Sequence, residues 1–133
     1  MDHQFGFAWI ALCASLAIHV TDEALTDFLS VYNPSVLAIR RRLPFLPLPT
    51  FKFGTWLGLL ILAVVALSAL SPFAFRAAPW MVRLAYVFGA IMLANGVGHV
   101  ASSIYLRRWM PGVYSSPLLL AISIWLLLVA RAG

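Results

Sequence analysis

Long apolar stretches alternate with short polar or proline-rich segments along the whole chain. A helix needs about 20 apolar residues to cross the hydrocarbon core of a bilayer, so each stretch is predicted to form a membrane span. The expected spans are residues 5–29, 53–70, 79–104 and 116–130. The pattern predicts an all-α polytopic membrane protein, in which residues 1–133 form a single domain, a four-helix transmembrane bundle.

The first span cannot be made from apolar residues alone. The apolar stretch from Phe5 to Ile18 has 14 residues, which is too short to cross the bilayer. The helix must therefore carry His19 and the following turn to membrane depth, whatever their function. This length argument places titratable side chains inside the lipid layer.

A short interfacial helix is expected after the first span. Asn33 is a suitable N-cap and Pro34 suits a first helical position. The segment that follows mixes apolar residues with three consecutive arginines, which favours a helix at the level of the lipid headgroups. The arginines are Arg40, Arg41 and Arg42, and the proline-rich loop expected next is residues 43–50.

Composition and charge narrow the functional classes. Hydrophobic residues make up 63% of the chain and charged residues only 10%, against roughly 25% charged in an average soluble domain. The net charge of +5 comes mostly from cations beside apolar spans, so we expect the lipid bilayer as the partner and no nucleic acid. Cys13 is the single cysteine, which excludes an intramolecular disulfide and a cysteine-cluster metal site.

The basic residues also predict an orientation. The loops after the first and third spans hold six of the nine Lys and Arg residues. By the positive-inside rule these two loops are expected in the cytoplasm. The six residues are Arg40, Arg41, Arg42, Lys52, Arg107 and Arg108.

Polar side chains gather on one face of the first span. His19, Glu23 and Asp27 are spaced by four residues, which places them on one stripe of a helix, with Asp22 beside it. Three of the four acids in the protein lie in this stretch. Acids at membrane depth cost roughly 2.5–3.5 kcal/mol each on insertion scales, so they are retained when they pair, neutralise or face a cavity.

The third span carries a matching polar pattern. Asn95 and His99 are four residues apart and share a helical face. The first and third helices of an up-and-down bundle run in the same direction, so both polar sets fall in the membrane half nearest the basic loops. The five groups expected to converge are His19, Asp22, Glu23, Asn95 and His99. A small-residue seam on the same helix predicts a close helix interface, and its members are Ala90, Ala94, Gly98 and Ser102.

Two kinds of chemistry suit these groups. In the first, His19, Glu23 and His99 ligate a divalent metal, since two imidazoles and a carboxylate with an open position suit Zn²⁺ or Fe²⁺. In the second, Glu23 or Asp22 acts as a general acid or base while a histidine shuttles the proton. Asn95 would orient a substrate carbonyl or stabilise an oxyanion in either case.

Three functional classes are compatible with such a site. The first is a metal-dependent or acid–base enzyme that acts on a lipid or another hydrophobic small molecule. The second is a binding or transport module for protons or a cation, acting as a homo-oligomer. The third is an accessory membrane subunit whose polar cluster only holds the helices together through interhelical hydrogen bonds.

The polar motifs resemble those of a family of small bacterial membrane proteins named for an HXXEE motif. Residues 19–23 read His-Val-Thr-Asp-Glu and match that motif with Asp22 in place of the first Glu. Residues 95–99 are similar to the family's Asn-Ala-x-x-His motif with Gly in place of Ala, and Arg107 with Pro111-Gly112 is similar to its Arg and Pro-Gly motif at a spacing one residue shorter. The resemblance covers nearly the whole chain. It implies a bacterial inner-membrane location and the same site residues, but no reaction, because the family has no established activity.

Overall fold

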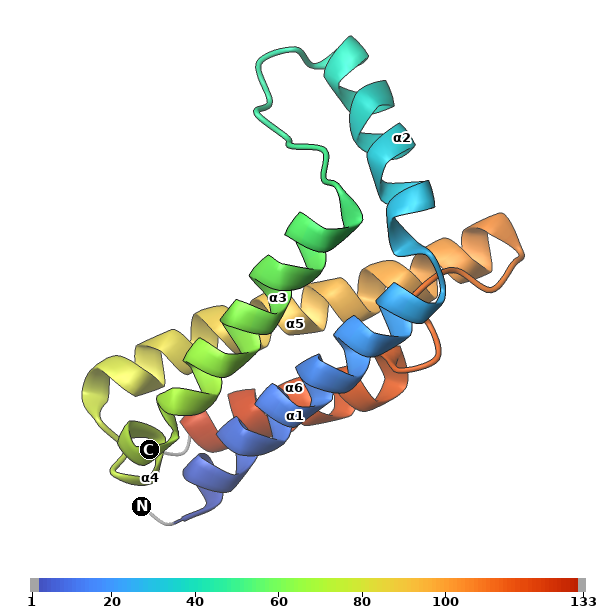
Figure 1. Ribbon diagram of the computed structural model, residues 1–133. Helices are drawn as coiled ribbons and strands as arrows, with labels where there is room; N and C mark the ends of the chain where they lie inside the picture. The colour runs from blue at the N-terminus through green and yellow to red at the C-terminus, as the bar shows by residue number, and fades with distance from the viewer. Residues whose placement is uncertain (1–2, 132–133) are drawn as a thin grey trace.

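The computed structural model describes residues 3–131, and its regular structure there is entirely helical (Figure 1). This confirms the all-α fold class. The helices in chain order are α1 (Gln4–Leu25), α2 (Phe28–Arg42), α3 (Phe53–Ala69), α4 (Ser71–Phe75), α5 (Pro79–Leu106) and α6 (Ser116–Arg131).

Helix α1 lies at the centre of the packing. It contacts α6 along one side and α3 and α4 along another, and α6 also packs against α5 (Figure 1). Trp9 of α1 is fully buried, stacks edge-on against Phe88 of α5, and donates its indole N–H to the Leu67 carbonyl oxygen of α3 at 3.0 Å. The half of the bundle that contains Trp9 is filled by apolar side chains, among them Phe5, Leu12, Leu16, Met81, Leu119 and Leu126.

Three helical stretches are long and apolar enough to cross a membrane: Gln4–Leu25, Phe53–Phe75 and Pro79–Leu106. The outward side chains of α3 are exposed apolar residues such as Leu59, Leu62 and Val65, which require lipid as their solvent. Helix α6 is also apolar, but its 16 residues reach only about 24 Å at a rise of 1.5 Å per residue, less than the ~30 Å core. The chain is therefore an integral membrane protein with three full-length candidate spans and a shorter fourth apolar helix.

The first helix ends earlier than the sequence pattern predicts. Helix α1 stops at Leu25 rather than at residue 29, because Asp27 takes the left-handed conformation with φ 56°. Helix α2 then begins at Phe28 and leaves at an angle to α1 (Figure 1). The expected stripe of polar residues consequently ends at Glu23, and Asp27 is exposed.

The interfacial helix does not start at Asn33 and Pro34, as the sequence suggested. Pro34 lies inside α2. Asn33 instead clamps the following loop, since its Oδ1 accepts the Phe51 backbone N–H at 3.0 Å and its Nδ2 donates to the Phe51 carbonyl at 2.9 Å. This pair of bonds satisfies backbone groups of an irregular segment and fixes where the loop enters α3.

The close contact of α5 with α6 uses glycines other than those in the predicted seam. A Cβ at Gly96 would lie 2.8 Å from Leu120 Cγ, and one at Gly89 would lie 3.0 Å from Leu127 Cγ, so these two glycines admit α6. The predicted seam residue Gly98 has no heavy atom within 4 Å of its Cβ position. No helix within residues 3–131 therefore packs closely against the seam at Gly98.

Candidate functional site

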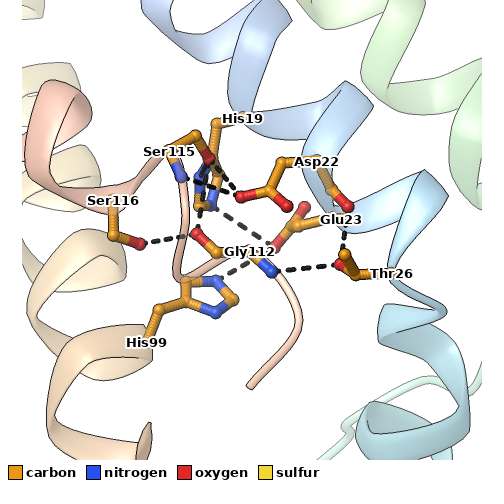
Figure 2. A network of polar contacts seen from close by, with 8 residues as sticks. All are labelled: His19, Asp22, Glu23, Thr26, His99, Gly112, Ser115 and Ser116. Carbon is orange, nitrogen blue, oxygen red and sulfur yellow. Dashed lines mark hydrogen bonds and ion pairs between the residues drawn. The ribbon is translucent and has the colours of Figure 1, made fainter. Parts of the chain in front are cut away.

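Two histidines and one carboxylate meet where α1 faces α5. Glu23 Oε1 lies 3.0 Å from His99 Nε2 and 3.5 Å from His19 Nε2. The three candidate ligand atoms lie within 4.8 Å of one another (Figure 2). His19 is 0% exposed, Glu23 6% and His99 8%, so the cluster is almost removed from solvent.

The placement follows from local helix geometry. His19 and Glu23 are four residues apart and share a face of α1, while His99 projects from the facing side of α5. The two imidazole rings pack edge-on with centroids 4.8 Å apart. The expectation that these three residues meet inside the bundle is therefore matched by their positions.

Asp22 takes a different place from the one expected for a catalytic acid. Its Oδ2 accepts two hydrogen bonds from Ser115, one from the backbone N–H at 2.8 Å and one from the hydroxyl at 2.7 Å. The Ser115 hydroxyl oxygen also lies 2.8 Å from His19 Nδ1 (Figure 2). Asp22 thus reaches His19 through Ser115 rather than contacting Glu23.

This chain of contacts assigns the tautomer of His19. A serine hydroxyl has one proton, and the Asp22 carboxylate at 2.7 Å is a closer acceptor for it than the Gly112 carbonyl at 3.3 Å, so Ser115 donates to Asp22. The bond between Ser115 Oγ and His19 must then be donated by the Nδ1–H of His19. The lone pair of a neutral His19 is consequently on Nε2, the nitrogen that faces Glu23.

His19 Nε2 is buried and has no hydrogen-bond partner among the described residues. Glu23 Oε1 lies 3.5 Å from it, and the oxygen of an ionised carboxylate can likewise only accept a hydrogen bond. Two acceptors facing each other in a buried place are unfavourable, because neither recovers the hydration it has lost. A cation between them satisfies both, and a proton or a metal ion can fill that role.

A tight loop covers the cluster. Gly112 has φ 82°, and a Cβ there would lie 2.7 Å from His99 Cε1 and 3.1 Å from Glu23 Cγ. Its N–H is bonded to Thr26 Oγ1 at 3.3 Å, and its carbonyl accepts the Ser116 hydroxyl at 2.7 Å. Both the backbone conformation and the close approach therefore require glycine at this position.

Asn95 lies beside the cluster rather than in it. It is half-buried on α5, one turn before His99. Both residues line a cavity of about 350 Å³ between α2 and α5. No hydrogen bond joins the Asn95 side chain to His19 or Glu23 in the described structure, so its contact with the site is through the shared cavity.

The loop between α5 and α6 and the first residue of α6 contribute groups that the polar pattern of the spans did not identify. Ser115, Ser116 and Gly112 all surround the cluster, and Thr26 closes it from the end of α1. The sequence pattern indicated only a basic turn here. The Pro-Gly pair at residues 111–112 was the one available signal, because a glycine after proline marks a turn of special conformation.

No curated protein and no solved structure matches this chain. A family model described as "Protein of unknown function with HXXEE motif" matches residues 7–126 and so covers the three motifs and the cluster they form. The chain belongs to this HXXEE-motif family.

Proposed function

We propose that this protein is a membrane-embedded metal-dependent enzyme that acts on a lipid or another hydrophobic small molecule. Its ion would be held by His19, Glu23 and His99. The observation that carries the proposal is the buried, unpartnered Nε2 of His19, which presents a lone pair to the Glu23 carboxylate. We further propose a bacterial inner-membrane location with the end of α2, the α2–α3 loop and the α5–α6 loop in the cytoplasm, because six of the nine Lys and Arg residues lie in these segments.

The distances support a metal centre. Bonds of about 2.0–2.1 Å in a tetrahedral site place neighbouring ligand atoms roughly 3.3 Å apart. The distances from Glu23 Oε1 to the two Nε2 atoms are 3.5 Å and 3.0 Å, on either side of that value. All three ligand atoms lie within 4.8 Å of one another, so the two imidazoles would move closer together to share one ion.

The donor set favours a catalytic rather than a structural ion. Two imidazoles and one carboxylate leave at least one coordination position for water or substrate, as in the catalytic zinc and non-haem iron sites built from these ligands. A bound ion would polarise a substrate carbonyl or activate water. His99 belongs both to the cluster and to the cavity wall, so it is where a substrate would approach.

The neighbouring groups have distinct roles in this proposal. Asp22 and Ser115 hold His19 in the tautomer that ligates through Nε2, which is how a metal-bound histidine is oriented by its other nitrogen. Asp22 is thus a positioning residue, although the sequence also allowed it as a general acid or base. Asn95 faces the cavity and is available to hydrogen-bond a substrate carbonyl.

Equilibrium dialysis tests the metal site. The purified protein in lipid nanodiscs is dialysed against Zn²⁺, Fe²⁺ or Mn²⁺, and bound metal is measured by mass spectrometry. We expect about one ion per chain in the wild type and none in H19A, E23Q or H99A. H3A is the matched control, because His3 is exposed and far in sequence from the cluster. Absence of binding by all three metals, or equal binding by the cluster variants, would refute the proposal.

Metal-free acid–base chemistry is the second candidate, supported by the 3.0 Å contact between Glu23 Oε1 and His99 Nε2, which is an ordinary hydrogen-bond distance. Proton or cation transport has less support, because the opposite half of the described bundle is packed with apolar side chains. If no metal binds, the acid–base function becomes the better explanation of the cluster.

A further inference from the structure

The cavity beside the cluster has two kinds of wall. The rings of Phe28 and Tyr32 on α2 form one side, and the seam residues Ala94 and Gly98 on α5 form the other. Nothing lies within 4 Å of a Cβ built on Gly98, so the small residues leave space rather than admit a helix. At about 350 Å³ the cavity is within the range of small-molecule sites.

Three polar side chains of the cavity lie on α5 around His99, whereas the hydroxyls of Tyr32 and Ser35 on α2 already donate to backbone carbonyls. Asn95 lies one turn before it and Ser102 one turn after it, and all three line the cavity. Most of the remaining lining is apolar or aromatic, including Val31 and Met110. A ligand that matches this distribution has one hydrogen-bonding group next to His99 and an apolar remainder.

An aromatic row continues from the cluster toward the bilayer. The Phe28 ring lies between His99, at a centroid distance of 5.7 Å, and Trp56 of α3, at 5.9 Å. A second cavity of about 220 Å³ shares Phe28 and Tyr32 with the first and is completed by residues of α3 that include Leu59. Leu59 is 52% exposed on the lipid-facing side of α3, so the second cavity adjoins the membrane interior.

We infer that these two cavities bind the hydrocarbon chain of a membrane lipid and place its carbonyl or hydroxyl group beside His99. The inference rests on the proposed function and names its substrate class. The lipid enters laterally, past Leu59 and Trp56, and its chain lies along Phe28 and Tyr32. Asn95 and Ser102 provide hydrogen bonds to the polar group at the cluster end.

A second copy of the chain is a poorer occupant of the open seam. A helix is a rigid rod about 10–12 Å in diameter, and the cavity between α2 and α5 is about 350 Å³. A hydrocarbon chain is much thinner and needs no backbone hydrogen bonds. The cavity is open on one side, and Phe28 and Tyr32 line both it and the second cavity beside Leu59, so a flexible hydrocarbon chain can follow both from the bilayer whereas a rigid helix cannot.

Photolabelling of the intact protein in nanodiscs tests this inference. The probe is a long-chain fatty acid that carries a diazirine on its chain, and labelled peptides are mapped by mass spectrometry. We expect labels in residues 28–35 and 94–102 of the wild type. G98L and A94F fill the cavity, so their labelling should fall about tenfold or more, because a filled cavity no longer admits the chain.

G58L is the matched control, since Gly58 is equally open but lies on the exposed face of α3 outside both cavities. Its labelling should equal that of the wild type, and all variants should retain their zinc. Unchanged labelling in both G98L and A94F would overturn the inference, as would a cross-link joining two copies through the α5 seam. Zinc binding without cavity labels would refute the lipid site alone, whereas labels without zinc binding would refute only the metal centre.

Discussion

Replacement of Ser115 by alanine tests how His19 is held. The Ser115 hydroxyl accepts the His19 Nδ1–H at 2.8 Å and donates to Asp22 Oδ2 at 2.7 Å. S115A removes both contacts but keeps the backbone N–H that bonds Asp22 at 2.8 Å. The loop should therefore stay attached to α1 while the imidazole loses the group that fixes its tautomer.

The expected effect on metal affinity follows from that loss. Removing the partner of a ligating histidine typically weakens metal binding by about 10–100-fold, or about 1.4–2.7 kcal/mol. His19 is fully buried, so no solvent replaces the lost acceptor, and the ring becomes free to place its proton on Nε2 instead. We expect the zinc dissociation constant of S115A to rise about 10–100-fold.

Ser116 provides a matched control. It is buried like Ser115 and donates its hydroxyl to the Gly112 carbonyl at 2.7 Å, but it does not contact His19. S116A should lose about 0.6 kcal/mol of stability, the average for a hydrogen bond inside a membrane protein, and change zinc affinity by less than about threefold. Competition with a chromophoric chelator in nanodiscs measures both affinities. Equal zinc affinities for S115A and S116A would refute the proposed role of Ser115.

Three other substitutions probe the surroundings of the cluster and the loop that enters α3. D22N replaces the carboxylate that accepts two Ser115 hydrogen bonds and should lower the free energy of unfolding, measured by SDS titration, by about 1 kcal/mol. D27N is the control, because Asp27 is exposed and Asn tolerates its left-handed backbone, and it should change that free energy by less than about 0.5 kcal/mol. Equal values for the two variants would contradict the structural role assigned to Asp22. G112A should destabilise by about 1–3 kcal/mol and weaken zinc binding, because its φ is 82° and its Cβ would meet His99, while G58A has open space and should be nearly neutral. N33A removes both bonds to Phe51 and should make residues 43–52 cleave faster in limited proteolysis, and an unchanged rate would show that the clamp does not hold the loop.

The sequence predicted the cluster because its geometry is largely local. His19 and Glu23 are separated by one helical turn, which fixes their common face, and the length of the apolar run fixes their depth. His99 could be added by comparing depths in two helices that run in the same direction. These three placements depend only on helical periodicity and bilayer thickness.

The parts that the sequence did not predict depend on loop conformation. Asp27 leaves the helix because its backbone is left-handed, and periodicity carries no signal for such a break. Ser115 reaches Asp22 only because the α5–α6 loop folds back over the cluster, and that contact joins residues 93 positions apart. Likewise, the seam that includes Gly98 was expected to receive a helix, but the angle of α2 leaves a cavity there instead.

X-ray absorption at the zinc edge of the loaded protein tests the central claim most directly. If His19, Glu23 and His99 hold the ion, the spectrum will show two imidazole nitrogens and at least one oxygen at about 2.0–2.1 Å, and H99A will lose one imidazole contribution. A spectrum with oxygen ligands alone, or one that H19A and H99A leave unchanged, would contradict the claim that these side chains form a metal centre.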